Sequence, residues 1–129
     1  MALETMEPNP VWTEEAYADS VTILRKCNDE VTYKVWGGDW CTDCRSQLPD
    51  FAAALAAAGV PENRIEDFPT EKEDDGSKTG SMVEEYGIEY IPTVVVEHDG
   101  EEIARFVESE TVPIAVYLAR ELEDLAARL

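Results

Sequence analysis

Two cysteines, Cys41 and Cys44, stand where one hydrophobic pattern gives way to another. Upstream, the β-branched and aromatic run 31–36 predicts a strand that ends at Gly37-Gly38. Downstream, apolar residues recur at the spacing of one helical face: Cys44, Leu48, Phe51, Leu55 and Ala58. The sequence therefore predicts a strand, a glycine turn and a helix in succession, with both cysteines at the start of the helix.

The rest of the chain also alternates between helical and strand patterns. Thr13 can cap a helix that runs to about Cys27, although its end, 21–24, could equally form a strand. Further along we expect a strand at 64–68, an exposed acidic loop at 66–78 and a helix from the capping box 81–84 to Gly87. Strands at 93–97 and 102–107 are joined by Asp99-Gly100, and a final amphipathic helix spans 112–129, with Leu129 on its apolar face.

This order of elements predicts an α/β fold. A central mixed β-sheet flanked by helices on both faces buries these patterns, and an additional N-terminal helix precedes it. The 129 residues fit a single domain, 1–129. Within it, residues 1–12, which include Pro8 and Pro10, are expected to form a flexible arm.

The charge balance limits the partners. The chain has 29 acidic and 10 basic residues, for a net charge of -19. Such a surface repels nucleic acid and anionic membranes, and no apolar run has the length of a membrane span. The first ten residues lack a basic region followed by an apolar stretch. We therefore expect a cytoplasmic protein that binds neither nucleic acid nor membrane.

The acidic excess has two interpretations. The acids are spread from Glu4 to Asp124, which favours a halophilic protein, because molar salt shortens the Debye length to about 3 Å and screens self-repulsion. Alternatively, the acidic surface recruits a basic partner.

A C-x-x-C pair is either a redox pair or half of a metal site. Zinc usually takes four ligands, and the other candidates, Cys27 and His98, lack ligand spacing, so we expect no metal. At a helix start, unpaired N–H groups and the helix dipole favour a thiolate at Cys41. Cys44 follows one turn deeper, on the buried face. Cys41 is thus expected to attack a disulfide and Cys44 to resolve the mixed disulfide.

The segment Trp40-Cys41-x-x-Cys44-Arg45, with Pro49 in the same helix, resembles the active-site segment of thioredoxins. The resemblance continues in Tyr86-Gly87-Ile88-Glu89-Tyr90-Ile91-Pro92-Thr93, at Asp99-Gly100 and in the final helix, and it spans about residues 31–129. It implies the thioredoxin fold and an enzyme that reduces protein disulfides. By the same resemblance, the enzyme needs no bound cofactor and receives electrons from a separate disulfide reductase.

The resemblance also implies roles for residues around the cysteines. Pro92 would be a cis-proline that faces them and lets the Ile91 backbone pair with an extended substrate. Trp40 would shield the thiol and contact substrates, and the residues between the cysteines, Thr42 and Asp43, would also meet the substrate.

The sequence departs from the thioredoxin pattern at three positions. Thr42-Asp43 replaces the usual Gly-Pro, and the charge of Asp43 disfavours a thiolate nearby. Val35 stands where thioredoxins often bury an aspartate as a proton relay, and Asp39 is expected to face solvent.

Two alternative functions remain: a disulfide oxidant or isomerase, and a binding module that holds partners without turnover.

Overall fold

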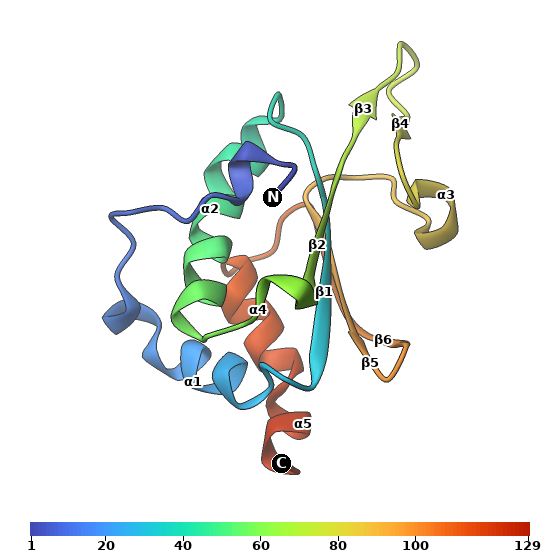
Figure 1. Cartoon of the computed structure of the whole chain (residues 1–129). Coiled ribbons are helices and arrows are strands. Elements are labelled where there is room, and N and C mark those ends of the chain that lie inside the picture. Colours follow the sequence, from blue (N-terminus) through green and yellow to red (C-terminus); the bar gives the residue numbers. More distant parts are fainter.

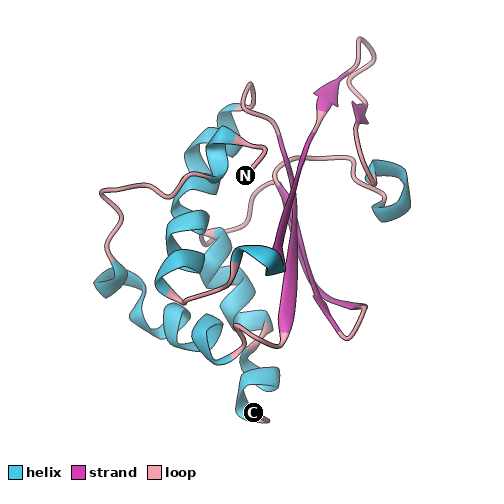
Figure 2. Ribbon diagram, in the orientation of Figure 1, coloured by secondary structure: helices cyan, strands magenta, loops and turns pink.

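A four-stranded sheet forms the centre of the computed structural model, which describes residues 1–129 (Figures 1 and 2). Its strands lie in the order β2 (Ile65–Pro69), β1 (Val31–Gly37), β5 (Thr93–His98) and β6 (Glu101–Val107). Strand β1 pairs in parallel with β2 and antiparallel with β5, and β5 pairs antiparallel with β6. The predicted mixed sheet is confirmed.

The larger helices lie on one face of this sheet, as Figure 1 shows: α1 (Ala18–Lys26), α2 (Thr42–Ala57) and α4 (Ile114–Glu121), followed by α5 (Glu123–Ala127). The one-turn helix α3 (Val83–Tyr86) lies on the opposite side. Three short 3-10 helices are also present: η1 (Glu4–Met6), η2 (Glu14–Tyr17) and η3 (Glu62–Arg64). The predicted α/β fold, with its additional N-terminal helix, is confirmed. None of the helices combines the length and apolar character needed to span a bilayer.

Aromatic pairs fill the core on both faces of the sheet. On the α2 side, Tyr33 meets Phe51 edge to face, with ring centroids 5.9 Å apart. On the α3 side, Trp36 stacks on Phe68 at 4.9 Å and lies 5.0 Å from Tyr86. The alternation of β1 side chains between the two faces therefore ties the sheet to both helical layers.

Glycine-containing turns end several elements as predicted. Asp99 and Gly100 both have positive φ, 52° and 81°, the backbone that a two-residue hairpin of β5 and β6 requires. Gly59 and Gly87 follow α2 and α3 with φ of 74° and 62°.

Residues 21–24 lie within α1, so the predicted helix is confirmed there and the alternative strand is not formed. Two other helix predictions need correction. The capping box is wrong: Met82, with φ 63°, precedes α3, and the Ser81 carbonyl instead accepts a hydrogen bond from Trp36 Nε1 at 3.0 Å. The predicted single final helix is interrupted at Leu122, and Leu129 lies beyond the end of α5, where it is 57% exposed and does not join the apolar face.

The acidic loop and the N-terminal arm also differ from expectation. The loop contains a small hairpin of β3 (Glu71–Lys72) and β4 (Lys78–Thr79). The first residues are docked rather than flexible, because Leu3 and Met6 are buried in the hydrophobic core. Two apolar side chains in a polar stretch form no periodic pattern, so the sequence did not reveal this packing.

Candidate active site

Cys41 caps the N-terminus of α2, just after β1 and a short link through Gly38. Its backbone is extended, with φ -89° and ψ 123°, and its Sγ accepts a hydrogen bond from the Cys44 N–H at 3.4 Å. The side chain is partly exposed. Because the sulfur is partly exposed at the start of the helix, where a substrate can reach it, this position suits a nucleophile.

The Ile91–Pro92 peptide lies beside Cys41 and is cis, as the resemblance implied. The Cys41 Sγ is 4.0 Å from the Ile91 carbonyl oxygen. Behind this peptide, the Glu108 N–H donates to the Pro92 carbonyl at 2.7 Å, and Thr93 Oγ1 donates to the Tyr90 carbonyl at 2.6 Å. The structure thus brings together Cys41 and the Ile91–Pro92 segment, which lie 50 residues apart.

Cys44 is fully buried one turn into α2. Burial raises the pKa of its thiol to about 12. A hydrogen bond from the Gly38 backbone acts in the opposite direction, whereas Cys41 and the charge of Asp43 raise the pKa further. The pair therefore consists of an accessible sulfur and a protected, protonated one.

Trp40 lies beside this pair and is 44% exposed. Its Nε1 donates to the Thr70 carbonyl at 3.0 Å, and Thr70 is itself anchored by its N–H, which donates to the Gly37 carbonyl at 2.8 Å. A Cβ on Gly38 would lie 2.5 Å from Trp40 Nε1, so the indole occupies the space of a side chain there. Sequence reasoning missed Thr70 and the role of Gly38, because the contact between Trp40 and Thr70 spans 30 residues.

The other predicted site residues of this turn are exposed. Thr42 and Asp43 both point away from the core, and the Asp43 carbonyl accepts a hydrogen bond from Ser46 Oγ at 3.1 Å. Val35 is fully buried in β1, so an apolar side chain stands at the relay position of thioredoxins.

Asp39 was expected to face solvent, but its side chain is held in contacts with the start of the chain. Its carboxylate accepts hydrogen bonds from the N–H groups of Glu4 (3.2 Å) and Thr5 (3.0 Å). Asp67, on β2, likewise accepts from Ala2 (3.1 Å) and Leu3 (2.6 Å). Neither partnership had a sequence signal, because the bonds join residues 34 to 65 positions apart.

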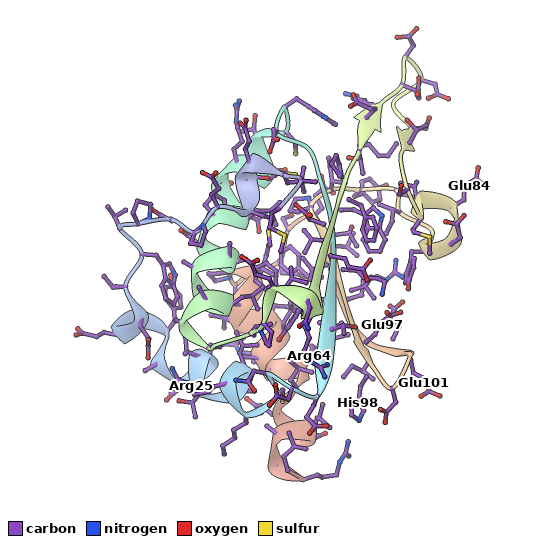
Figure 3. The ribbon with its side chains drawn as sticks, in the orientation of Figure 1. Arg25, Arg64, Glu84, Glu97, His98 and Glu101 are labelled. Atoms are coloured by element: carbon purple, nitrogen blue, oxygen red, sulfur yellow. The ribbon has the colours of Figure 1, made fainter.

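The two residues considered as further metal ligands make other contacts. Cys27 is fully buried, and burial, together with Glu30, raises the pKa of its thiol. His98 lies at the β5–β6 turn (Figure 3), where Nδ1 is 2.8 Å from the Glu30 carbonyl oxygen. No three His, Cys, Asp or Glu side chains gather into a cluster that could hold a metal ion.

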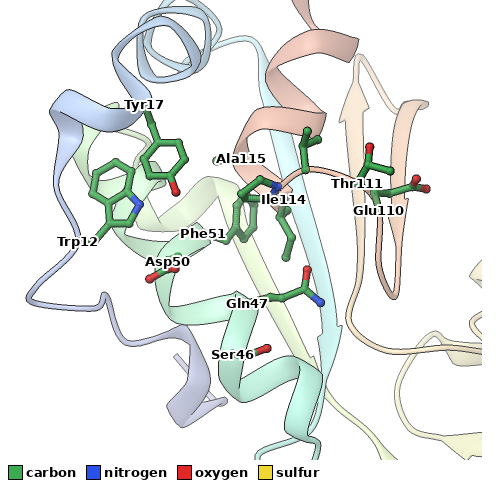
Figure 4. A pocket seen from close by; sticks show the side chains of 12 residues that line it. Trp12, Tyr17, Ser46, Gln47, Asp50, Phe51, Glu110, Thr111, Ile114 and Ala115 are labelled. Atoms are coloured by element: carbon green, nitrogen blue, oxygen red, sulfur yellow. The ribbon is translucent and has the colours of Figure 1, made fainter.

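A separate hollow of about 290 Å³ lies between α2 and the residues that precede and begin α4 (Figure 4). Trp12 and Tyr17 stack at one wall, with centroids 5.5 Å apart, and Asp50 and Phe51 of α2 form another. Neither Cys41 nor Cys44 lines it.

Two solved structures show where this architecture occurs. No protein-family model and no curated protein sequence matches the chain. The crystal structure of oxidized mitochondrial thioredoxin 3 from Saccharomyces cerevisiae superposes with a TM-score of 0.53 at 17% identity, over 81% of this chain and 89% of that one. A mutant thioredoxin from Halobacterium salinarum NRC-1 superposes with a TM-score of 0.50 at 21% identity, over 95% of this chain and 93% of that one. The chain has the thioredoxin fold, with its Cys41-x-x-Cys44 pair where β1 leads into α2.

Proposed function

We propose that the protein is a cytoplasmic thiol–disulfide oxidoreductase that reduces disulfides in other proteins. The observation that carries this proposal is the unequal placement of the two sulfurs: Cys41 is accessible beside the cis Ile91–Pro92 peptide, and Cys44 is buried one turn behind it. Dithiol exchange requires this order, because one thiol must meet the substrate before the other does.

The reaction has two steps. The Cys41 thiolate attacks one sulfur of the substrate disulfide, that S–S bond breaks, and the other substrate sulfur leaves as a thiolate that takes up a proton. Cys44 then loses its proton and attacks Cys41 Sγ, which releases the second substrate sulfur. The substrate gains two electrons and two protons, and the protein is left with a Cys41–Cys44 disulfide.

The substrate would bind across the exposed rim of this site. Trp40, Thr42 and Asp43 offer exposed side chains next to Cys41. Ile91 and Pro92 offer backbone that an extended peptide can meet, since proline brings no N–H of its own that would need a partner there. The partners of the protein are then disulfide-containing proteins and, for its own re-reduction, a separate disulfide reductase; no bound cofactor is needed.

The first test is the reduction potential of the Cys41–Cys44 pair, measured from the mass shift of alkylated thiols in defined redox buffers. A reversible two-electron transition near the thioredoxin value of about -270 mV supports a reductase. A value near about -120 mV assigns an oxidant instead. If no reversible transition occurs, the protein is not a dithiol oxidoreductase and a binding module takes its place.

Trapping of substrates tests the order of the two cysteines. We expect Cys44→Ser to accumulate mixed disulfides through Cys41, because the resolving sulfur is absent. Cys41→Ser should form none, and Cys27→Ala, which changes a buried cysteine outside the pair, should behave like the unmodified protein. Equal trapping by both serine variants would contradict the assigned order.

A further inference from the structure

The first residues of the chain are held by two carboxylates that lie far away in the sequence. The Asp67 carboxylate accepts hydrogen bonds from the N–H groups of Ala2 and Leu3 at 3.1 and 2.6 Å. The Asp39 carboxylate accepts hydrogen bonds from the N–H groups of Glu4 and Thr5 at 3.2 and 3.0 Å. Four consecutive backbone donors are therefore satisfied by charged acceptors, and such bonds are stronger than those between neutral groups.

One of these carboxylates belongs to the turn that carries the redox pair. Asp39 lies two residues before Cys41 and directly after Gly38. Figure 1 shows η1 beside the end of α2 at which the helix begins, and the two elements are in contact. A movement of residues 2–6 is thus linked by two hydrogen bonds to the turn that positions both thiols.

The side chains of this segment cover Cys44. A Cβ placed on Gly37 would lie 3.3 Å from Leu3 Cδ1, 3.5 Å from Cys44 Sγ and 2.9 Å from Leu48 Cδ1, so these three groups surround one point. Leu3 is 1% exposed and Cys44 is fully buried. Leu3 therefore forms part of the apolar wall that keeps solvent from the Cys44 thiol.

We propose that Ala2–Met6 form a clasp, fastened by Asp39 and Asp67, that controls access of solvent and small reagents to the Cys44 thiol. Asp39 and Asp67 are then positioning residues: they act on Cys44 through the clasp. Opening of the clasp exposes Cys44 to water and makes its deprotonation easier, because a solvated thiolate is more stable than a buried one. An effect of the clasp on the resolving step of the reaction rests on the proposed function. Its control of access to the Cys44 thiol does not.

The test measures alkylation of Cys44 by iodoacetamide, with no substrate present, in the Cys41→Ser protein, in which the pair cannot oxidise. Peptide mass spectrometry reads Cys44 and Cys27 separately in one sample. We expect Asp39→Ala and Asp67→Ala each to raise the Cys44 rate by about tenfold or more, because each removes two hydrogen bonds to a carboxylate. Asp74→Ala, an exposed aspartate of the hairpin loop, is the control of equal charge change.

Cys27 distinguishes clasp opening from general loosening, since it is fully buried and packs at the end of α1. A rise at Cys44 with no rise at Cys27 supports the clasp. Parallel rises at both cysteines, or no rise at Cys44, overturn it.

Leu3→Ala keeps all four hydrogen-bond partners and changes no charge, yet it opens the wall beside Cys44. We expect it to raise Cys44 alkylation too, and to move the midpoint of its pH profile downward, as Asp39→Ala should. If Asp39→Ala alone has this effect, the carboxylate charge and not the clasp controls Cys44, and the proposal fails. Because no substrate is involved, the result is independent of the reduction potential that tests the proposed function.

Discussion

At the scale of single residues, the turn between β1 and α2 has almost no free space. Gly38 is buried beneath the Trp40 indole, and Gly37 faces Leu3, Leu48 and Cys44. The glycines are needed because these side chains already fill the volume that a Cβ would take.

Gly38→Ala should therefore displace Trp40 and break the hydrogen bond from its Nε1 to Thr70. We expect a loss of about 1–3 kcal/mol in the free energy of unfolding, as for other overpacked sites. Urea denaturation measures the loss, and the indole N–H signal of Trp40 in NMR spectra reports its displacement. In a Trp40→Ala background the same substitution should cost little, since the clash is absent; an equal cost in both backgrounds would contradict the packing argument.

Cys44 makes the stability of the reduced protein depend on alkaline pH. Its pKa is about 12 in the folded protein, against about 8.5 for an ordinary thiol, so the unfolded chain loses this proton first. Above about pH 8.5 the folded state binds more protons, and stability falls by up to about 1.4 kcal/mol per pH unit.

We accordingly expect the reduced protein to lose about 2 kcal/mol more than Cys44→Ala between pH 8 and pH 10. Urea denaturation at the two pH values measures the difference. The other groups with raised pKa, such as Tyr33 and Cys27, are present in both proteins and cancel. Identical pH dependence of the two proteins would show that Cys44 is not protected by burial.

At the scale of elements, α3 is attached to the sheet by a polar network. The Glu97 carboxylate on β5 accepts hydrogen bonds from Lys34 Nζ of β1 at 2.6 Å and from the Tyr86 hydroxyl of α3 at 2.7 Å. Burial acts to raise the pKa of Glu97, but the hydrogen bonds from Lys34 and Tyr86 outweigh it and hold that pKa below its usual value. The network therefore contributes its full stability at pH values above the ordinary pKa of a glutamate. That stability is lost as the pH falls through the lowered pKa of Glu97.

Glu97→Gln should destabilise the protein by about 2 kcal/mol, because Lys34, whose side chain is 16% exposed, then keeps its charge with only the longer ion pair to the exposed Glu66, at 3.5 Å. The midpoint of urea denaturation measures this loss. Glu101→Gln is the matched control: Glu101 lies at the same hairpin (Figure 3), and its exposed side chain makes no hydrogen bond or ion pair, so its change should stay within about 0.5 kcal/mol. Equal effects of the two substitutions would contradict a role for the network.

At the scale of the whole molecule, the net charge of -19 is large for 129 residues. Few acids are paired: the ion pairs to Lys or Arg engage Glu14, Glu66, Glu97 and Glu102. The remaining carboxylates repel one another unless salt screens them.

Thermal stability should therefore climb between low and molar KCl, by about 5 °C or more, which corresponds to about 1 kcal/mol for a domain of this size. Differential scanning fluorimetry measures the midpoint. Replacing the exposed, unpaired acids Glu84, Glu85, Glu101 and Glu123 by Gln should flatten the dependence. A flat or falling curve for the unmodified protein would reject salt adaptation and favour recruitment of a basic partner.

The sequence by itself determined the elements whose cause is local. The β-branched run of β1, the helical face of α2 and the Asp99-Gly100 turn follow from steric preference and burial within a few residues. The Cys41–Cys44 pair was predictable for the same reason, since its spacing and its place after Gly37-Gly38 define a helix start.

Only the tertiary structure decided what depends on contacts between distant segments. The docking of Leu3, the roles of Asp39 and Asp67, and the anchor of Trp40 on Thr70 all join residues at least 30 positions apart. Met82 precedes α3 in a left-handed conformation while the Ser81 carbonyl bonds Trp36, so a distant aromatic side chain overrode the capping pattern. Such contacts form only after the sheet has brought these segments together, and a carboxylate or a leucine in the sequence carries no mark of the partner it will meet.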